Sequence, residues 1–312
     1  MLWSLSYLVN RPKMSDPLSD VLALLKPRSY VSAGFDAGGA WSVGFPHNVG
    51  IKCYAVVSGA CWLVVDGVTD PIALKAGDCF LLPGGRAFRL ASDPALPATA
   101  STEIFSAPRI GNVVTLNGGG DLFLVGSRFV LSGSHADILL AMLPPVVHIR
   151  KESEQAALRW SVERMMLELQ QQQPGSFLIA EHLAHMMLVQ ALRLHMTEEA
   201  AGVGWLFALA DKQMGAAIGA MHADPAQRWT LQSLAERVHM SRSAFAAKFK
   251  QMVGMSAMDY LTRWRMLLAG DRLANSSDPI SVIAPSLGYE SESAFSTAFK
   301  RVMGCAPRQY KS

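Results

Sequence analysis

Two ten-residue stretches carry nearly the same side chains, and the positions where they differ hold groups that can read a base pair. Residues 241–250 are SRSAFAAKFK and residues 291–300 are SESAFSTAFK, so six residues recur at an offset of fifty. Arg242 in the first stretch corresponds to Glu292 in the second. Arginine pairs with guanine and glutamate accepts from cytosine N4, each good pair adding about 1–3 kcal/mol of discrimination. Two stretches that share these six residues and differ between them predict one structural motif that occurs twice and reads two different targets.

Basic side chains lie close to both stretches and could contact phosphates, which position a protein on a duplex without reading its sequence. The candidate phosphate contacts are Lys248, Lys250, Lys300, Arg301 and Arg308. From residue 228 to the end there are twelve Lys and Arg against six Asp and Glu, a net charge of +6. The preceding residues hold sixteen against nineteen, a net of −3. This asymmetry indicates a polyanion as the partner of the C-terminal part only, and the helix-turn-helix pattern below makes double-stranded DNA the expected polyanion.

The first stretch is preceded by the elements needed to present it. Leu234 and Ala235 belong to the apolar face of a short helix, and the residues HMS then turn the chain. Ser241 is a favourable N-cap for the next helix. Phe245 and Phe249 lie four residues apart, so both face the core. This is the helix-turn-helix pattern, whose second helix enters the major groove.

The second stretch repeats this layout, with Ile283 and Ala284 facing inward, Ser291 as the cap, and Phe295 and Phe299 as anchors. The outward positions of the two second helices are the candidate base-facing residues: Arg242, Ser243, Ala246, Ala247, Glu292, Ser293, Ser296 and Thr297. Other roles remain open for some of them. Glu292 also stabilises a helix simply by its place in the first turn. The two alanines can only touch a thymine methyl group or permit close approach.

A helix over residues 257–274 is expected to connect the two units, with Arg263, Arg265 and Arg272 in solvent. Such a connector would hold two recognition helices at a fixed separation, and successive major grooves on one face of B-DNA lie about 34 Å apart. Pro285 falls inside the first helix of the second unit. Because a proline there removes a hydrogen bond at a cost of about 3 kcal/mol, we expect a kinked or shortened helix.

Residues 206–312 resemble the DNA-binding domain of the AraC/XylS family of bacterial transcription regulators, over both units, the connector and the closing GCAPRQYK. The resemblance implies a DNA-binding regulator that is not an enzyme. It also implies an activator, the commoner mode in the family, which would have RNA polymerase as a further partner. The recognition helices would read adjacent major-groove segments.

The N-terminal half has a different texture, with short apolar runs separated by Gly, Pro, Asp and Asn between about 30 and 130. Residues 51–67 read as a hairpin about Ser58 and Gly59, and two more short strands flank Gly77 and Asp78. Strands at this spacing favour a small sandwich or barrel. GDCFLLPGG resembles the second cupin motif, and residues 16–200 resemble the cupin-type sensing domain of one AraC/XylS branch.

These resemblances imply a cupin-like sensor with few metal ligands. Tyr54 and Phe88 occupy positions where related domains often have histidines, and His47 is the nearby histidine. We therefore expect no metal and no cofactor. An apolar interior with few polar groups suits a small organic effector, although aromatic rings can equally just fill a small barrel. The candidate effector-pocket residues are Trp41, His47, Tyr54, Trp62, Arg86 and Phe88.

The expected fold class is α+β and multidomain: a small cupin-like β-barrel with a helical hairpin, then an all-α domain with two helix-turn-helix units. The expected divisions are a flexible tail at 1–15, a sensing domain at 16–150, a hairpin that pairs two subunits at 151–200, a linker at 201–210 and a DNA-binding domain at 211–312.

The four cysteines show no CxxC pair, and no apolar run reaches the eighteen or so residues of a membrane span. We therefore expect a cytoplasmic protein without a membrane partner. The helical hairpin is expected to make it a homodimer. Thiol-based redox sensing, a cupin metalloenzyme with a DNA-binding tail, and an architectural DNA binder that senses no ligand remain as alternatives.

Overall fold

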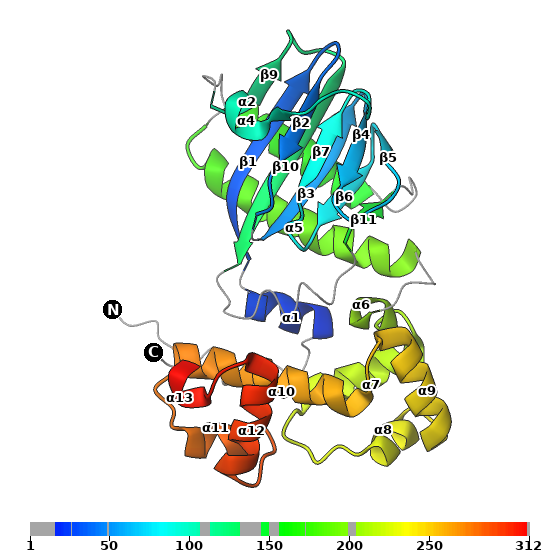
Figure 1. Cartoon of the computed structure of the whole chain (residues 1–312), viewed down its shortest axis with the longest axis vertical. Coiled ribbons are helices and arrows are strands. Elements are labelled where there is room, and N and C mark those ends of the chain that lie inside the picture. The colour runs from blue at the N-terminus through cyan, green and yellow to red at the C-terminus, as the bar shows by residue number, and fades with distance from the viewer. Residues whose placement is uncertain are drawn as a thin grey trace. The chain divides into compact units, whose positions relative to one another are not determined.

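The computed structural model describes residues 16–25, 27–48, 50–106, 113–131, 145–149, 156–171, 173–198 and 204–310. These form two compact units (Figure 1), one built from residues 27–132 and 143–199 and the other from residues 1–26, 133–142 and 200–312. The expected tail at 1–15 and the first part of the expected linker lie outside the described residues.

The first unit contains a mixed six-stranded sheet. Its strands, in spatial order, are β11 (Val147–Ile149), β6 (Cys79–Leu82), β3 (Ile51–Ser58), β10 (Leu122–Leu131), β1 (Pro27–Ala37) and β9 (Val113–Leu116). β10 pairs antiparallel with β1 on one side and with β3 on the other, whereas β9 runs parallel to β1. The long central pair β1 and β10 therefore holds together segments that are distant in sequence.

A five-stranded sheet faces it, with the order β5 (Ile72–Lys75), β4 (Ala60–Val65), β7 (Phe88–Ala91), β2 (Ser42–Phe45) and β8 (Thr99–Ala100). Phe35, Val43, Leu63, Phe80 and Leu124 belong to the apolar core of this unit. The two sheets do not close into a continuous barrel, so the cupin-like unit is an open sandwich rather than the expected barrel.

The expected hairpin at Ser58 and Gly59 is wrong in its pairing, although both of its strands exist. β3 pairs with β6 and β10, while β4 pairs with β5 and β7 in the other sheet. Gly59 has φ +80°, so the chain turns sharply there and crosses from one sheet to the other. The same crossing occurs between β5 and β6. A short apolar run shows that a strand forms but not which neighbour it pairs with.

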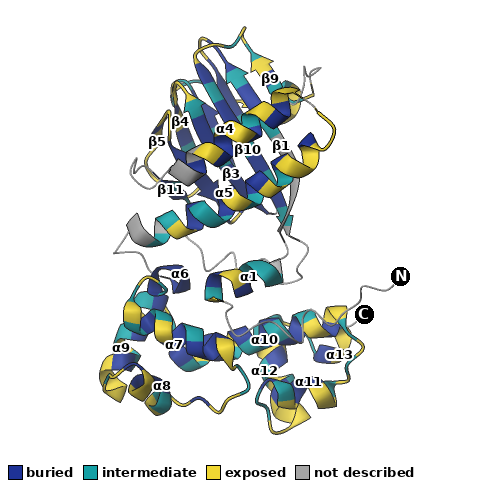
Figure 2. Cartoon of the chain, turned by 180° about the vertical axis from the view of Figure 1, so that it is seen from behind, coloured by how far each residue is buried: buried dark blue, intermediate teal, exposed yellow. Residues whose placement is uncertain are grey.

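Two helices, α4 (Ala156–Gln171) and α5 (Ser176–Glu198), form the predicted hairpin and pack on the six-stranded sheet (Figure 2). The buried side of α4 carries Leu158, Val162, Met165 and Leu169, a helical spacing of three and four residues. Trp160 is 55% exposed and lies outside this buried face.

The second unit is helical. Its C-terminal part starts, among the described residues, with α6 (Trp205–Ala208) and α7 (Lys212–Ala223). The remaining helices are α8 (Leu231–Arg237), α9 (Arg242–Val253), α10 (Ala257–Asn275), α11 (Ile280–Ser286), α12 (Glu292–Met303) and α13 (Pro307–Tyr310). The pairs α8–α9 and α11–α12 are the two helix-turn-helix units, and α10 connects them as predicted.

The N-terminal helix α1 (Pro17–Leu25) belongs to this second unit, where it packs against α7 and α10. The sequence groups this segment with the sensing domain that starts at residue 16. Leu18 and Val21 are buried, and their burial against α7 and α10 explains why α1 joins the helical unit although β1 follows it directly.

Candidate nucleic-acid interface and effector pocket

The two recognition helices α9 and α12 are built alike at both ends. The Ser241 and Ser291 hydroxyls accept hydrogen bonds from the backbone N–H three residues on, at 3.3 and 3.2 Å. Gly254 and Gly304 end the helices in the left-handed conformation, where glycine carries no steric penalty. The repeated serines and glycines thus fix where each helix begins and ends.

Phenylalanines anchor both helices and leave the opposite side in solvent. Phe245, Phe249, Phe295 and Phe299 are completely buried. Six of the eight candidate base-facing residues are exposed: Arg242, Ser243, Ala247, Glu292, Ser293 and Thr297. Ala246 and Ser296 are half-buried. The Thr297 hydroxyl donates to the Ser293 carbonyl oxygen at 2.9 Å, which leaves its lone pairs to accept a bond from DNA.

Four of the five candidate phosphate contacts, Lys250, Lys300, Arg301 and Arg308, are exposed. Lys248 differs, because its Nζ lies 2.7 Å from Asp211 Oδ2 and donates to Gln213 Oε1 at 3.0 Å. Asp211 is itself the N-cap of α7. Burial acts to raise the pKa of the Asp211 carboxyl, but the hydrogen bond and charge of Lys248 and the backbone hydrogen bonds of the cap together lower that pKa. Lys248 therefore links α9 to Asp211 at the start of α7.

The two turns differ by one residue. His239 in the first turn has φ +58° and corresponds to Gly288 with φ +80°, an offset of forty-nine rather than fifty. The second turn therefore contains an additional residue, Glu290, whose carboxylate pairs with Arg228. This difference changes the approach of the chain to α12 while both recognition helices keep twelve residues.

Arg265 on the connector α10 contacts the segment before the first unit and the turn of the second, rather than being solvated as expected. Its guanidinium donates to the Pro225 carbonyl oxygen at 2.6 Å and to that of Gln227 at 2.8 Å, just before the first unit. It also lies 5.7 Å from the ring centre of Tyr289, in the second turn. Arg272 likewise donates to the Ser286 hydroxyl. Sequence periodicity finds arginines on the outer side of a helix but not their backbone partners.

A buried polar group joins α1 to the helical unit. His222 on α7 lies 3.4 Å from Asp20 Oδ2 through Nδ1 and 2.8 Å from the Tyr260 hydroxyl through Nε2. Its ring stacks on Trp264 with centroids 3.8 Å apart. Burial lowers the pKa of His222 although Asp20 and Asp16 act in the opposite direction. A neutral imidazole fits this arrangement, since it can donate to Asp20 and accept from Tyr260.

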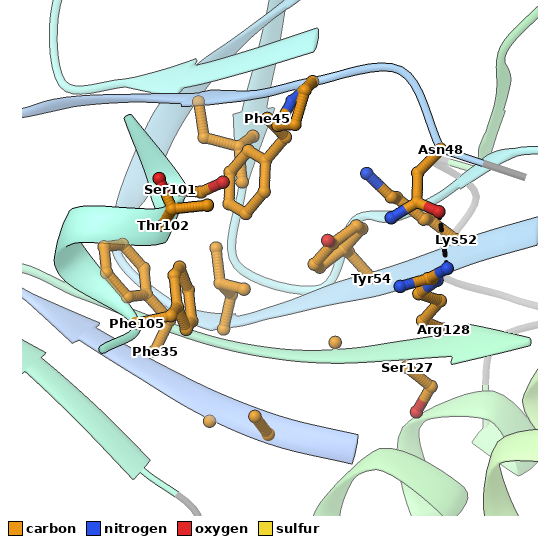
Figure 3. A pocket seen from close by; sticks show the side chains of 16 residues that line it. Phe35, Phe45, Asn48, Lys52, Tyr54, Ser101, Thr102, Phe105, Ser127 and Arg128 are labelled. Atoms are coloured by element: carbon orange, nitrogen blue, oxygen red, sulfur yellow. Dashed lines mark hydrogen bonds between the residues drawn. The ribbon is translucent and has the colours of Figure 1, made fainter. Parts of the chain in front are cut away.

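The sandwich contains a pocket of about 310 Å³, at the lower end of the range for small-molecule sites. One end is aromatic, with Phe35, Phe45 and Phe105, and the other is polar, with Lys52 and Arg128 among its residues (Figure 3). The full lining is Ala33, Gly34, Phe35, Phe45, Pro46, Asn48, Lys52, Tyr54, Leu90, Ser101, Thr102, Phe105, Leu124, Gly126, Ser127 and Arg128.

Tyr54 forms part of the middle of the pocket, and its place depends on a glycine. Gly126 lies directly opposite Tyr54 in the β3–β10 pair, and a Cβ at Gly126 would come within 2.3 Å of the Tyr54 ring. The ring therefore lies over the glycine and stacks on Phe80, with centroids 5.0 Å apart. Burial raises the pKa of Tyr54, so its hydroxyl stays protonated and acts as a neutral polar group.

Of the six candidate pocket residues, Tyr54 lines this pocket and the other five do not. Trp41 and Phe88 are buried in the core, and Trp62 is 36% exposed. His47 is exposed, and Arg86 donates to the Asp66 carbonyl oxygen at 3.1 Å. Lys52 and Arg128 were not singled out by the sequence. Their signal is a pair of basic residues within strands whose neighbours are apolar.

Two of the three buried cysteines have environments that disfavour the reactive thiolate. Cys53, Cys61 and Cys79 are buried and carry free thiols. Burial raises the pKa of Cys61 to about 12, and a hydrogen bond with Cys53, followed by burial, raises that of Cys79. Because the thiolate is the reactive form, these environments do not favour redox sensing. Among the described residues no three His, Cys, Asp or Glu side chains converge as metal ligands would.

One helix of the described chain, residues 176–194 within α5, is long and apolar enough to cross a membrane, with a mean hydropathy of 1.2. Ala180, Leu183, Met187 and Leu188 of this helix are buried in the structure. It packs against β1 and β11, as the core helix of a folded domain does.

Comparison with known proteins identifies the family. Residues 16–197 match the family described as Cupin, and residues 234–312 match that described as Helix-turn-helix domain. A Streptomyces lividans protein named as an AraC-like transcription regulator is 43% identical over 298 residues, which cover 95% of this chain and 98% of that protein. The chain belongs to the AraC-like family of transcription regulators. The predicted family, fold class and DNA-binding role are thereby confirmed.

Other relatives of this AraC-like regulator have similar lengths. The HTH-type transcriptional regulator AlkR of Acinetobacter baylyi is 29% identical over 88% of this chain and 91% of its own. Among solved structures, the C-terminal domain of AraT, a response regulator from Geobacillus stearothermophilus, is 34% identical with a TM-score of 0.30. It covers 32% of this chain and 82% of that domain. The Streptomyces lividans and Acinetobacter baylyi proteins are both named as transcription regulators.

Proposed function

We propose that this AraC-like regulator is an effector-responsive activator that reads two adjacent major-groove segments with α9 and α12. The observation that carries the proposal is the pair of equally capped, twelve-residue helices with exposed polar faces, both in contact with the connector α10. Arg242 and Ser243 would read the first segment, and Glu292 and Ser293 the second. A bacterial chromosome as the target makes the cytoplasm its place of action, and activation requires contact with RNA polymerase.

Effector binding in the sandwich would reach the DNA-binding unit along the chain itself. β1 carries Phe35 of the pocket lining and begins two residues after α1 ends. α1 in turn is held in the helical unit by the contact between Asp20 and His222. A ligand that displaces β1 would therefore act on α1 and so on α7 and α10. Allosteric coupling of this kind requires that the ligand bind the two states of the protein with different affinity.

We also propose that the helical hairpin pairs two copies of the chain. The two helices carry large apolar side chains that the rest of the unit leaves exposed: Trp160, Leu167, Phe177, Leu178, Ile179 and Met186. Exposed apolar groups that lie close together are typical of interaction sites. A second copy suits this surface because a two-fold dimer presents the same apolar side chains from both partners.

The decisive experiment is capture of fragmented genomic DNA by the full-length protein at near-physiological salt, followed by sequencing. We expect a motif with two boxes about one helical turn apart, and reporter output from a captured promoter that rises with the protein. Retention without a motif would favour the architectural DNA binder and contradict the proposal. A reporter that falls would contradict the activator role alone.

The route through α1 is tested on such a reporter with Asp20→Ala, which removes the partner of His222. We expect the response to growth conditions that alter wild-type output to be lost or strongly reduced. Asp70→Ala, an exposed residue outside this contact, serves as the control and should respond as the wild type does. An unchanged response in Asp20→Ala would exclude the route.

A further inference from the structure

We propose that the pocket binds a small organic anion with an apolar body, its negative group beside Lys52 and Arg128 and its body among Phe35, Phe45 and Phe105. The inference rests on the proposed function, since it names the chemical class of the effector. It is carried by the charges of the lining, the register of the sheet and the division of the pocket into two ends.

The register brings two cations together at one end. Lys52 and Arg128 lie directly opposite each other in the antiparallel β3–β10 pair. Both line the pocket, and the side chain of Asn48 accepts a hydrogen bond from the Arg128 guanidinium (Figure 3). Like charges directly opposite in a sheet destabilise it. A negative group between them would reverse the sign of that interaction.

The described lining contains no Asp or Glu side chain that could balance the charge of Lys52. Lys52 is only 6% exposed, and no salt bridge among the described residues includes it. Its ammonium instead lies over aromatic rings, 4.5 Å from the centre of Phe88 and 5.5 Å from that of Phe45. Cation–π contacts offset only part of the cost of burying a charge. A bound anion beside the Lys52 ammonium would offset the rest.

The pKa of the Lys52 ammonium predicts how anion binding should depend on pH. Burial, together with the charge of Arg128, lowers the pKa of Lys52 to about 8. A bound carboxylate would stabilise the protonated ammonium and raise that pKa. Binding of an anion should therefore weaken as the pH rises through about 8, whereas binding of a neutral molecule should not.

The opposite end of the pocket selects the body of the ligand. Phe35 and Phe105 are stacked with centroids 5.9 Å apart, and Phe45 lies 5.8 Å from Phe105. Leu90 and Leu124 complete an apolar surface. The hydroxyls of Ser101 and Thr102 are the polar groups near this end (Figure 3). An aromatic or aliphatic group of modest size is suited to this surface, while a second charge there would have no counterion.

The test is calorimetric binding of 4-phenylbutyrate and of 4-phenylbutan-1-ol, which share a body and differ in the anionic group. We expect the carboxylate to bind at least tenfold more tightly than the alcohol at pH 7, with the difference shrinking by pH 9. Octanoate and octan-1-ol repeat the comparison with an aliphatic body. Equal binding of acid and alcohol in both pairs, or no binding of either acid, would overturn the proposal.

Two variants distinguish binding at Lys52 from non-specific electrostatic attraction of anions to the protein. Lys52→Met keeps the length of the side chain without its charge and should lose the preference for the acid together with its pH dependence. Lys75→Met removes an exposed lysine of the same domain and should bind as the wild type does. Wild-type binding of the acid by Lys52→Met would also overturn the proposal. Because binding is measured without DNA, failure here would leave the genomic capture result intact, and failure of capture would not alter these affinities.

Discussion

The guanidinium of Arg265 lies 5.7 Å from the ring centre of Tyr289 while it donates to the Pro225 carbonyl oxygen at 2.6 Å. One side chain of the connector thus contacts the turn of the second helix-turn-helix unit and the segment that leads into the first. Gly288 allows this approach, since a Cβ there would lie 2.8 Å from Arg265 Nη2 and 2.4 Å from the Ala226 carbonyl oxygen. The separation of the two recognition helices therefore depends on Arg265 as well as on the length of α10.

Arg265→Met should destabilise the helical unit and weaken binding to two-box DNA more than binding to a single box. The methionine keeps much of the packing but leaves the Pro225 and Gln227 carbonyl oxygens without their donor, at a cost of about 1–3 kcal/mol. Urea unfolding and fluorescence anisotropy with both DNAs measure the two effects. Arg263→Met, on the same helix and exposed, is the control. An equal loss on both DNAs would show that Arg265 does not set the spacing.

Glu292→Ala and Lys250→Ala should affect DNA binding in different ways. A glutamate that accepts from a cytosine amino group contributes about 1–3 kcal/mol of discrimination, so its removal should relax the preference at one position of the second box. A lysine on a phosphate should weaken all sequences alike and reduce the salt slope by about 0.9. Selection from a randomised site and affinity at several salt concentrations measure these outcomes. Unchanged base preference in Glu292→Ala would assign that residue to helix stability alone.

Pro285→Ala should stabilise the helical unit. α11 covers seven residues, as α8 does, so the proline does not shorten the helix as the sequence suggests. Pro285 is exposed and lies in the last turn, where the new N–H could bond to the Ser281 carbonyl oxygen. The gain should stay below the full cost of about 3 kcal/mol for a proline in a helix interior, because alanine also frees the unfolded chain. Thermal and urea unfolding provide the measurement, and a lower midpoint would contradict it.

The sequence predicts what depends on local pattern and misses what depends on neighbours that are distant in the chain. The serine caps and the phenylalanine spacing lie within a few residues of one another, so the sequence places the start of both recognition helices to the residue. The role of Lys248 depends on Asp211, thirty-seven positions earlier, and the cationic end of the pocket depends on the pairing of Lys52 with Arg128. Register of this kind is decided by packing between whole strands, which single-strand patterns do not contain.

Acidification should destabilise the helical unit through His222. Burial holds the pKa of His222 below its unfolded value, so the unfolded state binds the proton first as the pH falls. Its contribution to stability is full above about pH 6.5 and is lost as the pH falls below that value, by up to about 1.4 kcal/mol per unit. The groups that face it are Asp20 from α1, Asp16 just before that helix, and Tyr260 from α10.

Urea unfolding between pH 5.5 and 7.5 measures this dependence, and His222→Gln should flatten it. His47→Gln, an exposed histidine, should keep the wild-type slope. Asp20→Asn should lower the pKa of His222 further and extend the loss to lower pH, because it removes the carboxylate that favours the charged imidazole. A wild-type slope in His222→Gln would assign the pH dependence to other groups.

Phe177→Asp should convert the proposed dimer into monomers. Phe177 is 66% exposed on α5, and Leu178, beside it, is 57% exposed; a carboxylate placed between two copies would be buried without a partner. We expect the dissociation constant to rise at least tenfold, with little change in the unfolding of the sandwich because the side chain lies outside its core. Sedimentation equilibrium gives the association state, and Gln170→Asp, an exposed polar position on α4, is the control. If the wild-type protein sediments as a monomer at micromolar concentration, the proposal that the hairpin is a dimer interface is wrong.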